Sequence, residues 1–511
     1  MLAIVCSCSN DEAVPPDGGT DSGSPVNDAG ADAADASDGA PTTVKRPSYN
    51  TGPGFFVLNG KLYDPNGHEF RLRGVNRNHY DSSSAAGLAK SGANAVRIFV
   101  ETNYGKTFPE LESIVQNDHV ANKEVPIITA PSTTSGTATS CNTDAATLTD
   151  VVANSWVAPA STWTALDKYS IVNIANEWGP TSSTTWRDSY VAAIGAMRGA
   201  GYLGTLLVDA GGCGQDLDDL VTYSKDVFEA DPQKNVMFAL HLYGSVNDYQ
   251  SSIASIQKGT TTVVTLTGTS TCHPFAPNYC PTLGKTNTYS GITAYQISGV
   301  QGMTQINGMQ AAPQNVGGAS GAWTITLNVD STSFAAYTSG GSVVDGNGNV
   351  NLRIAKLATL PAATGAAYAI TEFGPGRNIG PSPTLVTPLE IVTAAEQNGI
   401  GWLAWAWDDN NMAGSQTNNE WFGMTYNGAG TYAKDADLTM FGQQIVLGCT
   451  NPAPGGCGCP DGTPLPAYND PNDPSAPPPA IYQSVEPACS GTLAPTYQPL
   501  SLKLAQPATM F

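Results

Sequence analysis

Short apolar runs recur along the chain, and each ends in polar residues. Eight of these runs are present: 70–75, 95–100, 125–129, 171–175, 205–209, 236–240, 367–371 and 401–405. A near-continuous apolar run of this length is typical of a parallel strand buried on both faces. Helical patterns follow several runs, most clearly over 185–199 and over 389–398, where Gly399 would end the helix. Alternating strands and helices in this number predict an α/β fold, a closed (β/α)8 TIM barrel.

Two features lie outside the barrel pattern. Residues 55–63 hold two apolar segments around Asn59-Gly60, which predicts a hairpin because this dipeptide tolerates the positive φ of a tight turn. The stretch between the sixth and seventh runs is far longer than one βα unit. Its residues 258–365 are rich in Gly and Thr and alternate at period two, as in Trp323–Val329. We expect a small all-β insertion there, in a long loop at the mouth of the barrel.

The two ends of the chain differ from the middle. Residues 1–8 resemble the end of a lipoprotein signal, with Cys8 as a possible site of a lipid anchor; chance similarity is the alternative. Residues 9–50 are acidic and poor in apolar side chains, which predicts a disordered tether. The predicted barrel occupies 51–257 and 366–448. Residues 449–511 form a Cys/Pro-rich tail, either linked by disulfides or disordered.

Composition narrows the choice of partners. Lys and Arg number 22 against 43 Asp and Glu, for a net charge of −21 and a pI near 4.4. A strongly negative protein repels nucleic acid and anionic membrane surfaces, so we expect neither as a partner. Hydrophobic residues make up 41% of the chain, which is enough for a substantial core.

The chain has ten cysteines. Beyond Cys6 and Cys8 there are eight: Cys141, Cys213, Cys272, Cys280, Cys449, Cys457, Cys459 and Cys489. The lipoprotein-like start and the acidic tether favour a secreted or cell-surface protein, with an outer-membrane lipoprotein as one form. In an exported chain an even number of cysteines predicts up to four disulfides, whose pairing the sequence leaves open. The spacing does not suit a zinc site, and no apolar run is long enough to span a bilayer.

Two glutamates stand where predicted buried strands end. Glu177 follows the run 171–175, and Glu372 follows the run 367–371. Barrel enzymes carry their catalytic groups at this end of the strands. Two carboxyl groups about 5 Å apart can share glycoside hydrolysis, one attacking the sugar and the other donating a proton. The alternative is that each glutamate caps a helix or pairs with Arg97.

Several motifs in the expected order resemble glycoside hydrolase family 5, over 55–257 and 366–445. They are Arg73–Asn76, Ala93–Ile98, Asn176-Glu177, Val208–Asp216, His241–Tyr243, Glu372 and Gly401–Trp407, and the fifth- and eighth-strand segments look most like bacterial endo-β-1,4-mannanases. The resemblance implies a retaining β-glycanase in which Glu177 is the acid/base and Glu372 the nucleophile.

The resemblance also implies substrate-binding roles for a further set of residues: Arg97, Asn176, His241, Tyr243, Trp405 and His79. Arg97 and Tyr243 are expected to keep Glu372 ionised, while Glu177 stays protonated because no cation need lie beside it. Trp405 and Trp407 compete for stacking on the sugar, and Trp178 and Trp421 are candidates for outer subsites.

The sequence departs from the family pattern at two places. The family usually has a histidine at the end of strand three, where this chain has Ala130 and Pro131. Mannanases often carry two histidines in the first loop, where Arg77 takes the place of the first. Both differences affect the predicted subsite next to the scissile bond.

The sequence therefore predicts a monomeric endo-β-1,4-glycanase that needs no cofactor or metal. Its expected substrate is a plant-type polysaccharide, with mannan or glucomannan favoured. The alternatives are a cellulase of the same family and a catalytically weak, surface-bound carbohydrate-binding protein.

Overall fold

The computed structural model describes most of the chain from residue 43 onward. The described ranges are 43–77, 82–100, 105–244, 246–276, 279–286, 292–375, 386–408, 422–425, 430–433, 437–448, 452–453 and 456–457. The predicted signal with Cys8, most of the predicted tether, His79, Trp421 and most of the tail lie outside these residues. Among the described residues, no helix combines the length and apolar character needed to cross a bilayer.

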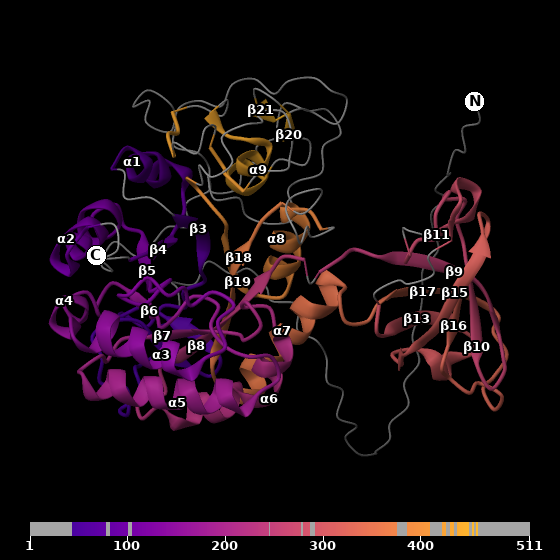
Figure 1. The fold of residues 1–511 in the computed structure, drawn as a ribbon, viewed down its shortest axis with the longest axis horizontal. Coiled ribbons are helices and arrows are strands. Elements are labelled where there is room, and N and C mark those ends of the chain that lie inside the picture. The colour runs from indigo at the N-terminus through magenta and orange to yellow at the C-terminus, as the bar shows by residue number, and fades with distance from the viewer. Residues whose placement is uncertain are drawn as a thin grey trace, which may run out of the picture. The chain divides into compact units, whose positions relative to one another are not determined.

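Eight parallel strands close into a barrel in the order β18-β19-β3-β4-β5-β6-β7-β8 (Figure 1). Their bounds are β3 Arg73–Arg77, β4 Ala95–Phe99, β5 Val125–Thr129, β6 Ile171–Asn173, β7 Leu206–Asp209, β8 Val236–Leu242, β18 Ala367–Phe373 and β19 Gly401–Ala404. Each of the eight predicted apolar runs contributes one strand. The predicted TIM barrel is confirmed.

Helices follow most of the strands and lie outside the ring. They are α1 Ser82–Ser91, α2 Phe108–Val115, α3 Ala145–Val151, α4 Ala160–Thr164, α5 Thr184–Gly199, α6 Leu217–Ala230, α7 Val350–Thr364, α8 Pro388–Gln397 and α9 Met440–Gly442, with π-helical turns η2 Gln116–Val120, η3 Val152–Val157 and η8 Gln443–Leu447. Helices α5 and α8 match the predicted helical segments. Helix α8 begins at a capping box of Thr387 and Glu390, which satisfies N–H groups that have no partner within the helix.

The predicted hairpin is also confirmed. Strands β1 Phe56–Leu58 and β2 Lys61–Tyr63 pair across Asn59 and Gly60, whose φ angles are 51° and 79°. The hairpin lies at the amino-terminal ends of the barrel strands, because the Val57 N–H donates to the Asn235 side chain just before β8, at 3.0 Å. The opposite ends of the strands remain available for the functional site.

A separate antiparallel sheet lies between β8 and β18 in the chain. Its strand order is β14-β13-β17-β9-β10-β16-β15. The bounds are β9 Gln250–Gln257, β10 Thr262–Leu266, β13 Tyr295–Gln301, β14 Gln310–Ala311, β15 Pro313–Ala319, β16 Ala322–Leu327 and β17 Ser339–Asp345; the shorter elements β11 Tyr279–Cys280, β12 Lys285–Thr286, η4 Pro281–Leu283 and η5 Thr304–Ile306 connect them. The hairpin β20 Pro452–Ala453 and β21 Gly456–Cys457 follows near the carboxyl end.

The observed insertion differs from the predicted one at both of its boundaries. The sheet starts at Gln250, not at residue 258. The sequence pattern did not indicate β9, because its three apolar side chains, Ile253, Ala254 and Ile256, do not follow the period-two alternation of a strand. Helix α7, predicted to be part of the insertion, contacts α6, α8 and β18 of the barrel. Proline disfavours the interior of a helix, and Pro361 lies inside α7, so the sequence pattern did not indicate a helix here.

Candidate active site

Glu177 and Glu372 meet at the carboxyl ends of the barrel strands. Glu372 is part of β18 and lies opposite His241 of β8. The register of the two strands shifts by one residue just before this pair. Glu177 lies four residues after the last residue of β6. Both side chains are buried. One carboxylate oxygen of each glutamate and one ring nitrogen of His241 all lie within 4.8 Å of one another.

Glu372 is held by two donors. Arg97 Nη1 donates to its Oε1, and the Tyr243 hydroxyl donates to its Oε2 at 3.0 Å. His241 Nδ1 lies 3.5 Å from the same Oε2. These contacts fix both carboxylate oxygens, so that the carboxylate has one orientation in the site.

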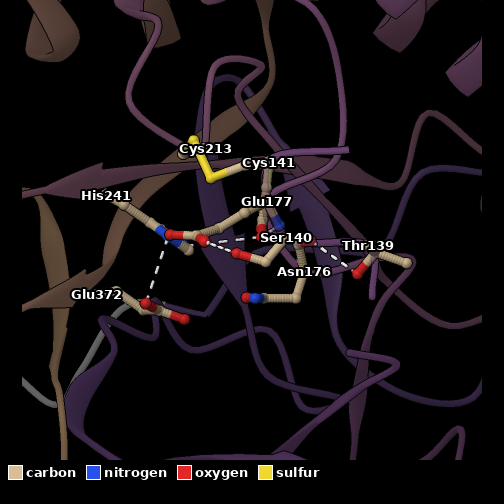
Figure 2. The surroundings of a disulfide bond; sticks show 9 residues. Thr139, Ser140, Cys141, Asn176, Glu177, Cys213, His241 and Glu372 are labelled. Atoms are coloured by element: carbon tan, nitrogen blue, oxygen red, sulfur yellow. Dashed lines mark hydrogen bonds and ion pairs between the residues drawn. A yellow bond between two sulfur atoms is a disulfide. The ribbon is translucent and has the colours of Figure 1, made fainter. Parts of the chain in front are cut away.

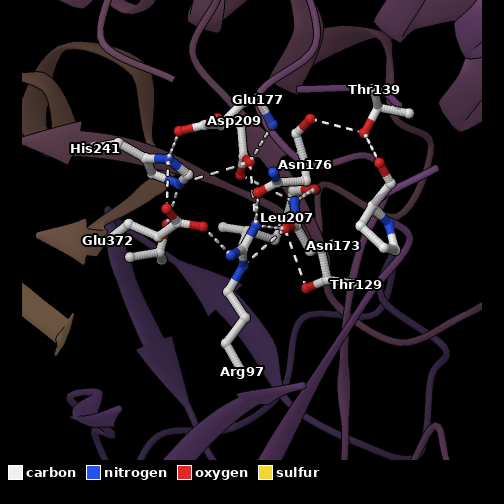
Figure 3. A network of polar contacts seen from close by, with 12 residues as sticks. Arg97, Thr129, Thr139, Asn173, Asn176, Glu177, Leu207, Asp209, His241 and Glu372 are labelled. Atoms are coloured by element: carbon white, nitrogen blue, oxygen red, sulfur yellow. Dashed lines mark hydrogen bonds and ion pairs between the residues drawn. The ribbon is translucent and has the colours of Figure 1, made fainter. Parts of the chain in front are cut away.

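Arg97 joins several strand ends into one buried network (Figure 3). Its guanidinium donates to the side-chain oxygens of Asn173 at 2.7 Å and of Asn176 at 2.7 Å, and it lies 3.3 Å from Asp209 Oδ2. It also donates to Asn76 at 3.1 Å. Because Asn176 accepts from Arg97 through its oxygen, its NH2 group is left as the donor for a ligand. A buried guanidinium needs this many acceptors to offset its desolvation.

Glu177 is held from both sides. His241 Nδ1 lies 2.8 Å from its Oε1, and the Ser140 hydroxyl donates to its Oε2 (Figure 2). Its backbone N–H donates to Asp209 Oδ2 at 2.9 Å. The backbone itself has φ 52°, a left-handed conformation that costs a residue other than glycine roughly 1–3 kcal/mol. The surrounding hydrogen bonds stabilise this turn.

The pKa of Glu177 differs from the sequence-based expectation. Burial raises the pKa of this carboxyl group, but the hydrogen bond and charge of His241, the hydrogen bond from Ser140 and the charge of Arg97 together outweigh burial, and the pKa lies below its ordinary value. The expectation was that Glu177 stays protonated; His241 beside it instead favours the ionised form of the carboxyl group. Burial lowers the pKa of His241. The charges of Glu372, Asp209 and Glu177 raise this pKa by more than burial lowers it, so that it lies above the ordinary value.

Glu372 also departs from the expected protonation. Burial raises its pKa more than the charges of His241 and Arg97 lower it, so the net direction is upward. The expected stabilisation of the ionised form by Arg97 is present, but it is smaller than the effect of burial. His241 contacts both Glu177 and Glu372, so the apparent pKa values belong to the group of three and not to single residues.

The tryptophans of the eighth strand separate into two kinds. Trp402 and Trp407 are fully buried, and their indole N–H groups donate to Glu396 and to the Gly430 carbonyl, each at 2.9 Å. Trp405 is only partly buried and meets Phe99 edge to face, with the ring centroids 5.2 Å apart. Of the two competing rings, Trp405 is thus the one with accessible surface. Trp178, a candidate for an outer subsite, is fully buried.

Arg77 belongs to a different buried group. Its Nη1 donates to Asp118 at 3.0 Å and lies 3.1 Å from His119 Nε2, while its Nε lies 3.4 Å from Asp408. Burial, and then the charge of Arg77, hold the pKa of His119 well below its ordinary value. Arg77 is thus occupied by structural partners.

Asp209 and Ser140 are among the polar residues of the site that were not predicted to have a role in it. Asp209 contacts Arg97, Asn173 and the Glu177 N–H, and its place at the end of an apolar run is the sequence signal that could have indicated it. Ser140 lies in a loop without periodicity, so no sequence signal marks it.

Glu177, His241 and Glu372 are also the kinds of side chain that bind metals. Among the described residues they form a group whose ligand atoms would suit one ion. The Arg97 guanidinium already contacts Glu372, and the raised pKa of His241 favours its cationic form. Both charges oppose a divalent cation at this position.

Known proteins of similar sequence indicate the family of the chain. A family model described as cellulase (glycosyl hydrolase family 5) matches residues 63–272. Mannan endo-1,4-beta-mannosidase from Salipaludibacillus agaradhaerens is 33% identical over 212 residues, which cover 39% of this chain and 67% of that protein. The enzyme of the same name from Streptomyces lividans is 34% identical over 200 residues, 37% of this chain and 51% of that protein, so the chain spans about half the length of that relative.

Among solved structures, the beta-mannanase from Thermomonospora fusca superimposes with a TM-score of 0.47 at 20% identity, covering 77% of this chain and 94% of that one. The family match and the two relatives identify the chain as a glycoside hydrolase. It belongs to glycosyl hydrolase family 5.

Proposed function

We propose that the protein is a retaining endo-β-1,4-mannanase. The observation that carries the proposal is the short distance between Glu177 and Glu372, whose nearest ligand oxygens lie within 4.8 Å. Retaining glycosidases place their two carboxyl groups about 5–5.5 Å apart, while inverting enzymes need roughly 6.5–9.5 Å to admit a water molecule.

In the proposed reaction, Glu372 attacks the anomeric carbon and Glu177 protonates the leaving oxygen. Arg97 and Tyr243 orient the Glu372 carboxylate. Water then attacks the glycosyl-enzyme with Glu177 as the base, and the product keeps its anomeric configuration. Asn176 offers its NH2 group to the sugar, and the accessible face of Trp405 packs against the apolar side of the ring.

The acid proton is shared by the Glu177–His241 pair. His241 Nδ1 and Glu177 Oε1 lie 2.8 Å apart, so a proton on either atom is in position to pass to the other. The pair acts as an acid while it holds this proton. Because the pKa of His241 is raised, the proton is retained at pH values above the ordinary histidine value of 6.5 and is lost as the pH rises further.

The choice of mannan is supported by the relatives. Both relatives are named mannan endo-1,4-beta-mannosidase. The family description, cellulase, keeps β-1,4-glucan as the second candidate. Release of reducing ends from mannan, glucomannan and carboxymethyl-cellulose distinguishes the two candidates. We expect mannan and glucomannan to be the faster substrates, and a preference for the cellulose derivative would reverse the order.

Two measurements test the catalytic roles. Glu372→Gln should lower kcat on mannan at least about 10³-fold while the fold is kept, because the amide is a poor nucleophile. Proton NMR of the first product should show the β-anomer. A product of inverted configuration would reject the retaining mechanism, and calorimetric binding of mannan oligosaccharides without hydrolysis by the wild type would favour the carbohydrate-binding protein.

We further propose that the protein works outside the cytoplasm. Bonds join Cys141 to Cys213 and Cys272 to Cys280, and disulfides persist mainly in oxidising compartments. Cell fractionation with thiol labelling tests this location. Recovery from the cytosol with these cysteines reduced would contradict it.

A further inference from the structure

The Cys141–Cys213 disulfide joins two loops that flank the Glu177–His241 pair (Figure 2). The first loop follows β5 and includes Thr139–Cys141. The second follows β7 and includes Gly212–Gly214. The two cysteines are 72 positions apart in the sequence, and their Cα atoms lie 4.2 Å apart. The reaction proposed above uses neither loop directly.

The first loop holds Glu177 and the residue before it. The Thr139 hydroxyl donates to the Asn176 carbonyl at 2.8 Å, and the Cys141 N–H donates to the Glu177 carbonyl at 3.0 Å. Between them, the Ser140 hydroxyl donates to Glu177 Oε2. Three successive residues thus fix the backbone and the carboxyl group of the glutamate.

The second loop supports the imidazole. The Gly214 carbonyl accepts from the His241 N–H at 2.8 Å. Gly214 has φ 74°, and a Cβ at this position would lie 2.6 Å from His241 Nδ1. The loop therefore lies directly against the ring, which in turn contacts Glu177 Oε1.

The disulfide joins the exposed or partly buried parts of the two loops, next to buried Thr139 and Gly214. Ser140 and Cys141 are exposed and Cys213 is only partly buried. Both cysteines adopt left-handed backbone conformations, with φ 57° and 59°, which residues other than glycine rarely keep unless tertiary contacts enforce them. The covalent bond supplies such a contact between the two loops.

We propose that Ser140 is a positioning residue for Glu177 and that the Cys141–Cys213 disulfide holds Ser140 and Gly214 against the Glu177–His241 pair. The inference rests on the proposed role of Glu177 as acid/base. Ser140 orients Oε2 and His241 orients Oε1, so the bond between their loops sets the direction in which the carboxyl group delivers its proton. Displacement by about 1 Å can lower the rate of such a step about 10²-fold.

The test compares Ser140→Ala, Ser140→Thr and the double variant C141S/C213S with wild type. The matched control is C272S/C280S, which removes the other described disulfide, located in the insertion between β10 and β12. Two rates are measured: kcat on mannan, and the burst of dinitrophenolate from an activated dinitrophenyl β-mannooligosaccharide, whose leaving group needs no proton from Glu177.

We expect Ser140→Ala and C141S/C213S to lower kcat on mannan about 10–100-fold, with KM and the dinitrophenolate burst close to wild type. Ser140→Thr, which keeps the hydroxyl group, and C272S/C280S should retain kcat. In Ser140→Ala the alkaline limb of the pH profile should move upward, because a donor that lowers the pKa of Glu177 is lost.

Three outcomes overturn the proposal. Wild-type kcat in Ser140→Ala removes the positioning role, and equal losses in the two double variants show that the disulfides act only on stability. A proportional loss of the burst and of kcat shows that the whole site is disturbed. If C141S/C213S does not fold, mild reduction of the wild type, with circular dichroism to verify the fold, replaces it. Glu177→Ala separates the two proposals: full activity of that variant on mannan rejects the acid/base role itself.

Discussion

Arg97 organises the site at the level of single residues. It is fully buried, and its nitrogens reach acceptors on β3, β6, β7 and β18 together with Asn176. A planar guanidinium can serve several acceptors in fixed directions, whereas an ammonium group is a point charge with fewer donors. The identity of the residue, and not only its charge, therefore determines how Glu372 and Asn176 are oriented.

Arg97→Lys should lower kcat on mannan about 10²-fold, because the reacting carboxylate loses its fixed direction while a positive charge is kept. Steady-state kinetics measures the effect, and circular dichroism verifies the fold. Lys90→Arg on α1 serves as a control for the exchange of the two cations. Activity within about twofold of wild type in Arg97→Lys would show that charge alone suffices.

Removal of metal ions should leave the activity unchanged. Arg97 and His241 already supply positive charge next to the carboxylates of the site, so a divalent cation would meet repulsion there. Dialysis against EDTA followed by the mannan assay checks this expectation. A loss of activity that is restored by one added cation would contradict it.

At the level of elements, Glu396 ties helix α8 to two barrel strands. It accepts from Arg73 of β3 at 2.8 Å, from Arg71 at 3.2 Å and from the Trp402 indole of β19 at 2.9 Å. Burial raises the pKa of Glu396, but the hydrogen bond and charge of Arg73 lower it more, and the net pKa is below the ordinary value. The ionised form is thus favoured in the folded protein.

Glu396→Gln should lower the free energy of unfolding at pH 7 by about 1–3 kcal/mol. A lowered carboxyl pKa stabilises the fold above the ordinary value of 4.5, and this contribution disappears as the pH falls through the lowered pKa. The difference between wild type and variant should therefore shrink on acidification. Urea unfolding at pH 7 and pH 3 measures it.

Glu69→Gln is the control for this prediction. Glu69 pairs with Lys61 at 2.6 Å, but both side chains are about half exposed. Exposed pairs contribute about 0–1 kcal/mol. If Glu396→Gln lowers the free energy of unfolding no more than Glu69→Gln, the contacts of Glu396 with the barrel strands do not stabilise the fold.

At the level of the whole molecule, the described residues form two hydrophobic clusters without shared members. One cluster lies in the barrel and the other in the inserted sheet. The chain enters and leaves the sheet at one place, where the Asn247 N–H donates to the Gly348 carbonyl at 2.8 Å and the Asn247 amide donates to Asp345 at 2.7 Å. A core of its own and adjacent ends are the features of a folding unit.

Replacing residues 250–345 with a short Gly/Ser linker should leave the barrel folded and active, because the adjacent ends need little chain to join them. Calorimetry should show one transition fewer than in the full chain, and the dinitrophenolate burst should be retained. Loss of the folded barrel in this variant would show that the sheet is required for its stability. A matched deletion of α7, which packs on α6, α8 and β18, should by contrast unfold the barrel.

Much of this architecture could be predicted from local chemistry. Apolar runs located all eight barrel strands, and Asn59-Gly60 located the hairpin, because strand burial and turn geometry depend on neighbouring residues. Glu177 and Glu372 stood out for the same reason, since each follows a run that is buried. Helix α7 was missed because Pro361 breaks the local pattern that tertiary packing nevertheless tolerates.

The sequence by itself determined the barrel, the order of its elements and the two glutamates at the strand ends, since these follow from which side chains must be buried and in what order. Only the tertiary structure decided that Cys141 bonds Cys213, that Trp405 keeps an accessible face, and that His241 lies against Glu177. These features depend on distances between groups far apart in the chain. Protonation depends in addition on the sum of burial and charge at each of these groups, which no local pattern contains.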